Sequence, residues 1–207
     1  MKTTIGILAL AVLSLTVSCK DNKESKHSEE THSGEMEEHD NSEMNHDNSD
    51  GHHSESVNAE RSIEANPQRN PATTPIIESY LQIKNALASD DKNAAAKGAS
   101  AMLAAISSFN KTELDKTQEK EYMEIAESVK EQAEHIAKSP IDHQREHFET
   151  MSTDVIDLIT LLGTNKTLYQ DYCPMKKVSW LSEIKEIKNP FYGSKMMTCG
   201  SIKKQIN

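Results

Sequence analysis

Four amphipathic segments joined by short connections constrain the fold of this 207-residue chain more than any other feature. Within each segment, apolar residues recur every three or four positions, which is the spacing of one face of an α-helix. Helices linked by such short connections pack most simply as antiparallel neighbours. We therefore predict an all-α fold, an antiparallel four-helix bundle followed by a small irregular Cys/Met-containing C-terminal lobe, with helices at about 74–89, 92–109, 113–138 and 140–162.

Capping and breaking residues set these predicted boundaries. Ser139 as an N-cap, Pro140 at the first helical position and Asp142 in the first turn together favour the start of the fourth helix. Gly163 favours its end. The second segment is rich in alanine, and its small side chains allow a close approach to a neighbouring helix. About 140 residues follow the N-terminal linker, which is enough for one hydrophobic core and not for two.

The C-terminal lobe begins beyond Gly163, where the helical periodicity stops. Its short apolar runs suit extended segments or a small hairpin, and the pattern does not choose between them. Pro174 and Pro190 exclude a continuous helix through the lobe. We expect Gly193 and Gly200 to supply the backbone freedom that a tight ligand loop needs.

Soft sulfur donors are concentrated in this lobe. Thiolate and thioether groups select Cu(I), Zn or an iron–sulfur cluster over hard cations, and the methionines favour Cu(I), because zinc is normally bound by Cys, His and carboxylate. Ag(I) and Zn are the alternative ions. We expect the lobe to place Cys173 and Cys199 near one another. The candidate ligands are Cys173, Met175, Met196, Met197 and Cys199. The alternative is that the cysteines form a structural disulfide and the methionines only pack.

The N-terminus is typical of an exported lipoprotein. Residues 1–19 combine an early lysine, an apolar run of signal-peptide length and a final Leu15–Cys19 stretch that resembles a bacterial lipobox. Acylation of Cys19 would anchor the mature chain to a membrane of the cell envelope, on the periplasmic side or at the cell surface. The alternative is simple cleavage and release. Because an acylated Cys19 has no free thiol, Cys173 and Cys199 are then the remaining thiols.

The net charge of −10 belongs to the segment after the signal peptide. Residues 20–60 carry thirteen Asp or Glu against three Lys, whereas the chain from Arg61 onward carries twenty acids against nineteen bases. We predict a disordered acidic His/Met-rich linker over 20–72 and one domain, the bundle with its metal-binding lobe, over 73–207. A near-neutral domain without a basic face does not favour nucleic-acid binding.

Six of the nine histidines lie in the predicted linker. Neutral imidazoles among carboxylates can bind Cu(II), Zn or Ni, although each site in a disordered segment would be weak. The alternative is a solvated acidic linker without a metal role. The residues concerned are His27, His32, His39, His46, His52 and His53, interleaved with Met36 and Met44.

A second histidine feature lies at the start of the fourth helix. His143 and His147 are four residues apart, so both imidazoles lie on one helical face and can bind one metal ion. The alternative is a solvated polar face. His135, near the end of the third helix, is interpreted as a surface residue.

Several spaced motifs carry a resemblance to a known family. From about Ile76 to Gly200, the chain resembles the uncharacterised domain found at the C-terminus of CusB-like periplasmic adaptors of heavy-metal efflux pumps and alone in small lipoproteins. The association of that family with copper and silver export implies a soft-metal role, and implies that His143, His147, Cys173, Met175, Met196 and Cys199 form one site. The motifs are His143–Phe148, Tyr172–Met175, Trp180–Leu181 and Glu186–Gly193, with Met196, Cys199 and Gly200.

Two functional hypotheses follow from these features. The first is a membrane-tethered, extracytoplasmic Cu(I)- or Ag(I)-binding protein that sequesters the ion or passes it to a heavy-metal efflux adaptor or pump. The second is a disulfide-stabilised helical interaction module that docks on an efflux or sensor complex. We do not expect an enzyme, because the chain shows no Ser/His/Asp constellation, no phosphate-binding glycine loop and no paired carboxylates on a helical face.

Overall fold

A computed structural model describes residues 61–63, 65 and 68–206. The predicted signal peptide, Cys19 and the histidines of the acidic linker lie outside the described residues. Among the described helices, none has the length and apolar character that a membrane span requires. Arg61, which precedes the predicted domain boundary, already contacts the domain through an ion pair with the buried Asp154, at 2.6 Å.

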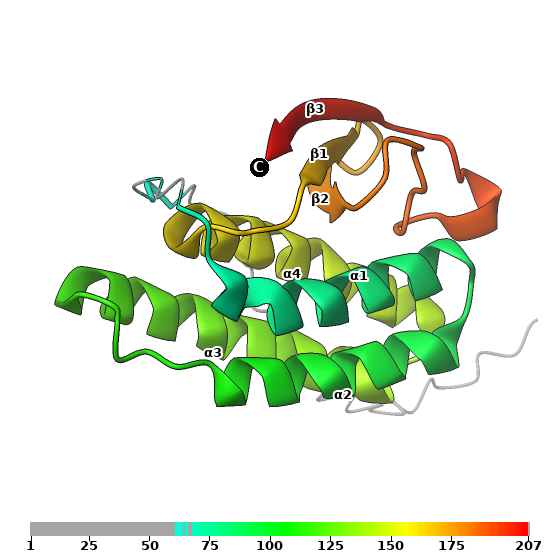
Figure 1. The fold of residues 1–207 in the computed structure, drawn as a ribbon. Coiled ribbons are helices and arrows are strands. Elements are labelled where there is room, and N and C mark those ends of the chain that lie inside the picture. Colours follow the sequence, from blue (N-terminus) through cyan, green and yellow to red (C-terminus); the bar gives the residue numbers. More distant parts are fainter. Residues whose placement is uncertain (1–60, 64, 66–67, 207) are drawn as a thin grey trace, which may run out of the picture. The chain divides into compact units, whose positions relative to one another are not determined.

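Four antiparallel helices form the bundle, as predicted (Figure 1). A short 3₁₀ segment, η1 (Pro71–Thr73), leads into the first helix. Each helix packs against the next in sequence, and α1 and α4 also contact each other. The helices are α1 (Thr74–Ala88), α2 (Lys92–Ser108), α3 (Lys116–Lys138) and α4 (Ile141–Leu162).

Local capping explains why the helices begin where they do. Asp115 accepts hydrogen bonds from the backbone at the start of α3, while Gln118 accepts one from Asp115 N, which completes a capping box. Asp91 caps α2 in a similar way. The cap predicted at Ser139 is wrong: α4 begins at Ile141 after Pro140, with no side-chain cap, and Ser139 N instead bonds to His135 O at the end of α3.

Small residues bring α1 and α2 close together, as the alanine-rich second segment predicted. A Cβ atom at Gly98 would lie 2.8 Å from Ile83 Cγ1 and 3.0 Å from Ile83 N, so no larger residue fits without a shift. Elsewhere in the core, the rings of Tyr80 and Phe148 stack with centroids 5.1 Å apart. At Gly98 the backbone of α2 therefore packs directly against the side chain and backbone of Ile83 on α1.

The C-terminal lobe is a three-stranded antiparallel sheet, so the predicted all-α class is wrong. The strands are β1 (Leu168–Cys173), β2 (Val178–Ser182) and β3 (Ser201–Ile206), in the order β2-β1-β3. Aromatic and β-branched residues in β1 and β2 favour strand over helix. β3 is an edge strand with five exposed residues, and its polar Ser-Ile-Lys-Lys-Gln-Ile sequence gave little sign of sheet pairing.

The sheet packs on the α1–α4 side of the bundle, and α2 and α3 form the opposite layer (Figure 1). Trp180 on β2 is fully buried and meets the ring of Phe191 edge-on at 5.7 Å. Phe191 in turn lies 6.0 Å from Phe148 on α4. These three rings form an apolar connection from the sheet into the bundle core.

Arg145 provides a polar connection between the same two parts. This buried α4 side chain donates from Nε to Pro190 O at 3.2 Å and from Nη2 to Leu87 O at 3.0 Å, and it pairs with Asp90. The other carboxylate oxygen of Asp90 accepts from Ser194 N at 3.1 Å. The guanidinium therefore fixes the segment after Asn189 against the α1–α2 connection.

Buried polar side chains lie where the sheet meets α1. Lys84 is fully buried and donates to Glu183 at 2.9 Å, after the end of β2. Asp171 on β1 is also fully buried, and neither of its carboxylate oxygens has a hydrogen-bond partner. Burial raises the pKa of Asp171 to about 7, and the positive charge of Lys84 opposes the rise.

Candidate soft-metal site

The two cysteines lie next to each other, as the sequence predicted. Cys173 is the last residue of β1 and is fully buried, whereas Cys199 lies in the loop before β3 and is half-buried. Both are free thiols. Gly200 sits so close to β1 and β2 that an added Cβ would be 2.7 Å from the ring of Trp180 and 3.1 Å from Tyr172 O. Its φ of 156° also favours glycine, so the loop needs this residue to approach Cys173.

Asn189 holds the two cysteine segments together. Its side-chain Nδ2 donates to Cys173 Sγ at 3.3 Å and to Cys199 O at 2.6 Å. Its backbone N donates to Met197 O at 2.8 Å, and its side-chain oxygen accepts from Phe191 N at 2.9 Å. Asn189 is fully buried. Sequence reasoning did not assign it a site role, although the Asn-Pro pair was visible as a turn signal.

The environment of Cys199 favours its protonated form. Partial burial raises the pKa of the Cys199 thiol, and the adjacent Cys173 raises it further through its charge and a hydrogen bond. A soft metal ion that binds both sulfur atoms must displace their protons, so metal affinity at this site should increase with pH.

The three candidate methionines lie near the cysteines in the chain and differ in exposure. Met175 lies in the turn between β1 and β2 and is 62% exposed. Met196 follows the 3₁₀ segment η2 (Gly193–Lys195), is 36% exposed, and its carbonyl accepts from Cys199 N at 3.0 Å. Met197 is half-buried. Met196 thus shares one tight turn with Cys199, and Met175 lies two residues beyond Cys173.

The histidine pair lies on α4, apart from the sulfur residues. His143 is exposed, with Nδ1 3.4 Å from Glu146 Oε2. His147 is half-buried, with Nδ1 2.9 Å from Gln132 Oε1 on α3. Burial lowers the pKa of His147, followed by the positive charge of His135, so its imidazole is neutral at pH 7.

No preassembled metal cluster is present in the described part of the chain. Within residues 61–63, 65 and 68–206, no three His, Cys, Asp or Glu side chains are grouped so that they could hold an ion. Among the same residues, no hydrogen bond, ion pair or ring contact joins His143 or His147 to Cys173 or Cys199. The structure therefore brings the thiols together but does not include the histidines in the same cluster.

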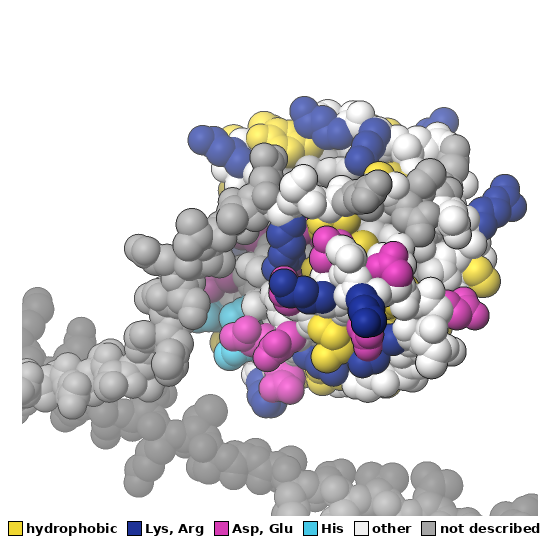
Figure 2. Space-filling view, turned by 90° about the vertical axis from the view of Figure 1, so that its left-hand side faces the viewer, with side chains coloured by type: hydrophobic (Ala, Val, Ile, Leu, Met, Phe, Trp, Pro, Cys, Tyr) yellow, Lys and Arg dark blue, Asp and Glu magenta, His cyan; other side chains and the backbone are white. Residues whose placement is uncertain are grey.

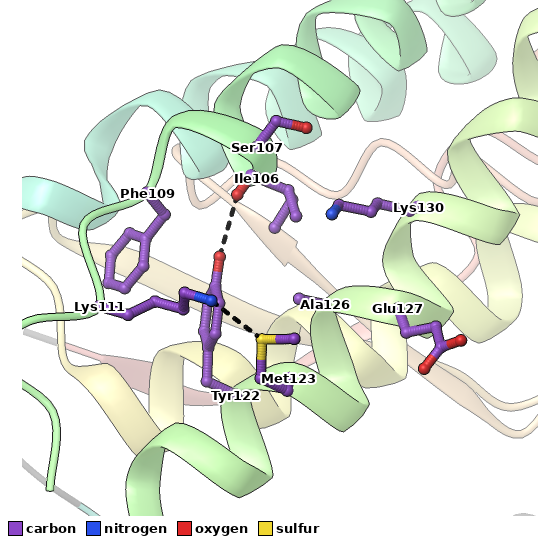
Figure 3. A pocket seen from close by; sticks show the side chains of 9 residues that line it. All are labelled: Ile106, Ser107, Phe109, Lys111, Tyr122, Met123, Ala126, Glu127 and Lys130. Atoms are coloured by element: carbon purple, nitrogen blue, oxygen red, sulfur yellow. Dashed lines mark hydrogen bonds between the residues drawn. The ribbon is translucent and has the colours of Figure 1, made fainter.

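A separate pocket of about 450 Å³ lies where α2 leads into α3 (Figure 3). Tyr122 forms part of its wall: the ring stacks on Phe109 at 4.8 Å, and the hydroxyl donates to Ile106 O at 3.1 Å. Burial raises the pKa of Tyr122 to about 12. Lys111 and Lys130 are among the lining residues, but none of the predicted metal ligands is.

Comparison with known proteins finds that part of the chain is similar to an uncharacterised family. Residues 76–167 match the model of a family described as "Protein of unknown function (DUF3347)". No curated protein and no solved structure matches the chain. The family match covers the four helices and ends one residue before β1, so both cysteines of the candidate site lie beyond it.

Proposed function

We propose that this protein binds Cu(I) or Ag(I) outside the cytoplasm while tethered to a membrane, and sequesters the ion or passes it to an efflux system. The observation that carries the proposal is the pair of adjacent free thiols, Cys173 and Cys199, held in place by Asn189. Two thiolates with thioethers nearby form the donor set that soft monovalent ions prefer.

The exposed methionines suggest how an ion would enter and leave. Met175 and Met196 are exposed and lie two and three residues from Cys173 and Cys199 in the chain, whereas Cys173 is buried and Cys199 is half-buried. A neutral thioether is released more easily than a thiolate, so an incoming ion would first contact methionine and then move to the thiols. The reverse exchange would deliver it to a partner. Each thiol that binds the ion loses one proton to solvent.

Location and partner rest on the sequence. The lipobox-like ending at Cys19 supports a lipid anchor, and the resemblance to domains of CusB-like adaptors supports an efflux adaptor or pump as the recipient. The His/Met-rich linker would collect ions near the membrane and increase their local concentration around the lobe.

The test is an anaerobic Cu(I) competition titration of the reduced protein against a colorimetric chelator. The double variant Cys173→Ser, Cys199→Ser should lose one tightly bound equivalent. Met196→Leu should weaken that equivalent without abolishing it. Met123→Leu is the matched control, since Met123 is 49% exposed on α3 and lies outside the lobe.

Equal competition by the wild type and the double-serine variant would overturn the proposal. Quantitative oxidation of both cysteines in protein isolated from its own compartment would do the same. In either case, the disulfide-stabilised interaction module becomes the better account of the lobe.

A further inference from the structure

Two imidazoles stack across the groove between α3 and α4. The rings of His135 and His147 lie with centroids 4.4 Å apart and planes inclined by 14°. His135 was interpreted from the sequence as a surface residue. It is exposed on one side, but its ring covers that of His147, which comes from the neighbouring helix. The pairing depends on how the two helices align.

Gln132 selects the tautomer of His147. The amide oxygen Oε1 only accepts hydrogen bonds, so His147 Nδ1, at 2.9 Å, must carry the proton. The other ring nitrogen, Nε2, then keeps its lone pair. Metal-binding histidines in proteins characteristically donate their second ring nitrogen to a carbonyl or carboxylate in this way. The Gln132–His147 pair has that arrangement before any metal is bound.

A third imidazole lies one turn away on the same helix. His143 precedes His147 by four residues, and its side chain is 65% exposed. Its contact with Glu146, at 3.4 Å, is a surface contact that permits rotation toward His147. Figure 2 shows histidine side chains at the surface beside a group of acidic residues, which would favour the approach of a cation.

We propose that His135, His147 and His143 form a second metal site, for a divalent transition ion of the Zn(II), Ni(II) or Cu(II) class. The stack keeps the imidazoles of His135 and His147 side by side on neighbouring helices. Because the nitrogen lone pairs of stacked rings do not converge, the ring of His135 must turn out of the stack to share an ion with His147, and His143 completes the site by rotation. This fits the absence of a preassembled three-ligand cluster among the described residues. Nitrogen ligands suit borderline divalent ions, whereas the thiol pair suits soft monovalent ions. The protein therefore carries two sites of different selectivity.

The test is a Zn(II) titration of the full chain, followed by NMR signals of the individual histidine rings. Because each ring is observed separately, linker histidines and the thiols do not obscure the result. The ring signals of His135 and His147 should shift together, with those of His143, along one saturating curve. The same shifts should appear in the Cys173→Ser, Cys199→Ser variant, which separates this site from the thiol site.

Two variants sharpen the assignment. His147→Asn should abolish the shift at His135. Gln132→Leu keeps all three histidines but removes the acceptor for Nδ1, so Zn(II) affinity should fall about tenfold. The wild-type titration alone decides whether the three histidines bind Zn(II), even if neither variant folds. Unchanged His135 and His147 signals at Zn(II) concentrations that saturate the linker histidines would overturn the proposal.

Discussion

The helical bundle and the sheet lobe differ in charge, in connectivity and in how they are stabilised. Residues 61–163 carry eleven Lys or Arg against seventeen Asp or Glu, whereas residues 164–207 carry eight Lys against three acids. The near-neutral domain expected from the sequence is thus an acidic bundle next to a basic lobe. Lysine side chains are visible around the upper part of the molecule in Figure 2, where the lobe lies.

The two parts also differ in which contacts hold them. The bundle buries a large apolar core between helices that are consecutive in the chain, together with polar side chains such as Ser79, Gln144 and Ser152. The lobe depends on contacts that are distant in sequence, such as the rings of Phe148 and Phe191, the Arg145 bonds and the hydrogen bond from Lys84 to Glu183. The bundle should therefore fold by itself more readily than the lobe, and changes in the lobe should affect the thiols first.

The largest expected effect comes from removing the anchor of the lobe. Trp180→Ala deletes a fully buried ring that contacts both Phe191 and the segment at Gly200. We expect the free energy of unfolding to fall by about 4 kcal/mol, with faster alkylation of Cys173 and little change in helical circular dichroism below the transition. Met123→Ala, at an exposed position, should change stability by less than about 0.5 kcal/mol. If thiol reactivity is unaffected by Trp180→Ala, the lobe does not depend on this anchor.

An intermediate effect concerns the buried carboxyl between the two parts. Burial raises the pKa of Asp171 from its usual value near 4 to about 7, so the native state holds this proton more tightly than the unfolded state. The contribution of Asp171 to stability is therefore fully present below about pH 4 and is lost as pH rises to about 7.

Asp171→Asn should remove this dependence because an amide does not titrate. Between pH 4 and 7, the free energy of unfolding of the wild type should fall by about 3 kcal/mol relative to the variant. Denaturant titrations of both proteins at several pH values measure the difference directly. Parallel curves would mean that Lys84 keeps Asp171 ionised in the native state.

The smallest effect tests the bundle itself. In Gly98→Ala, the new methyl group meets Ile83 at 2.8 Å, while alanine gains about 1 kcal/mol of helix propensity over glycine. We expect the steric cost to be larger, with a net loss of about 1 kcal/mol and no change in thiol reactivity or metal binding. Ser100→Ala, at an exposed position on the same helix, should instead be neutral or slightly stabilising. A more stable Gly98→Ala protein would show that α1 and α2 can separate without cost.

The difference between local contacts in the bundle and distant contacts in the lobe explains what could be predicted from the sequence. The helices were correct to within a few residues because periodicity and capping residues such as Asp91 act locally. The sheet was missed because β3 pairs with β1 about thirty residues earlier, and a mostly exposed edge strand has no clear apolar alternation. The closeness of Cys173 and Cys199 was correctly predicted. The roles of Asn189 and of the His135–His147 stack were not, since each depends on the alignment of distant elements.

The hydrogen bonds from Asn189 to Cys173 and Cys199 also bear on the order of folding. Cys173 and Cys199 are 26 residues apart in the sequence, and they meet only after β1 has formed and the later loop has closed onto it. Contacts between residues this far apart in the chain form late, because closing the intervening loop costs conformational entropy. If the chain binds a soft ion as proposed, the bundle would thus be formed before the thiols could hold the ion. The bound ion would then stabilise the closed lobe, because it binds the folded state and not the open one.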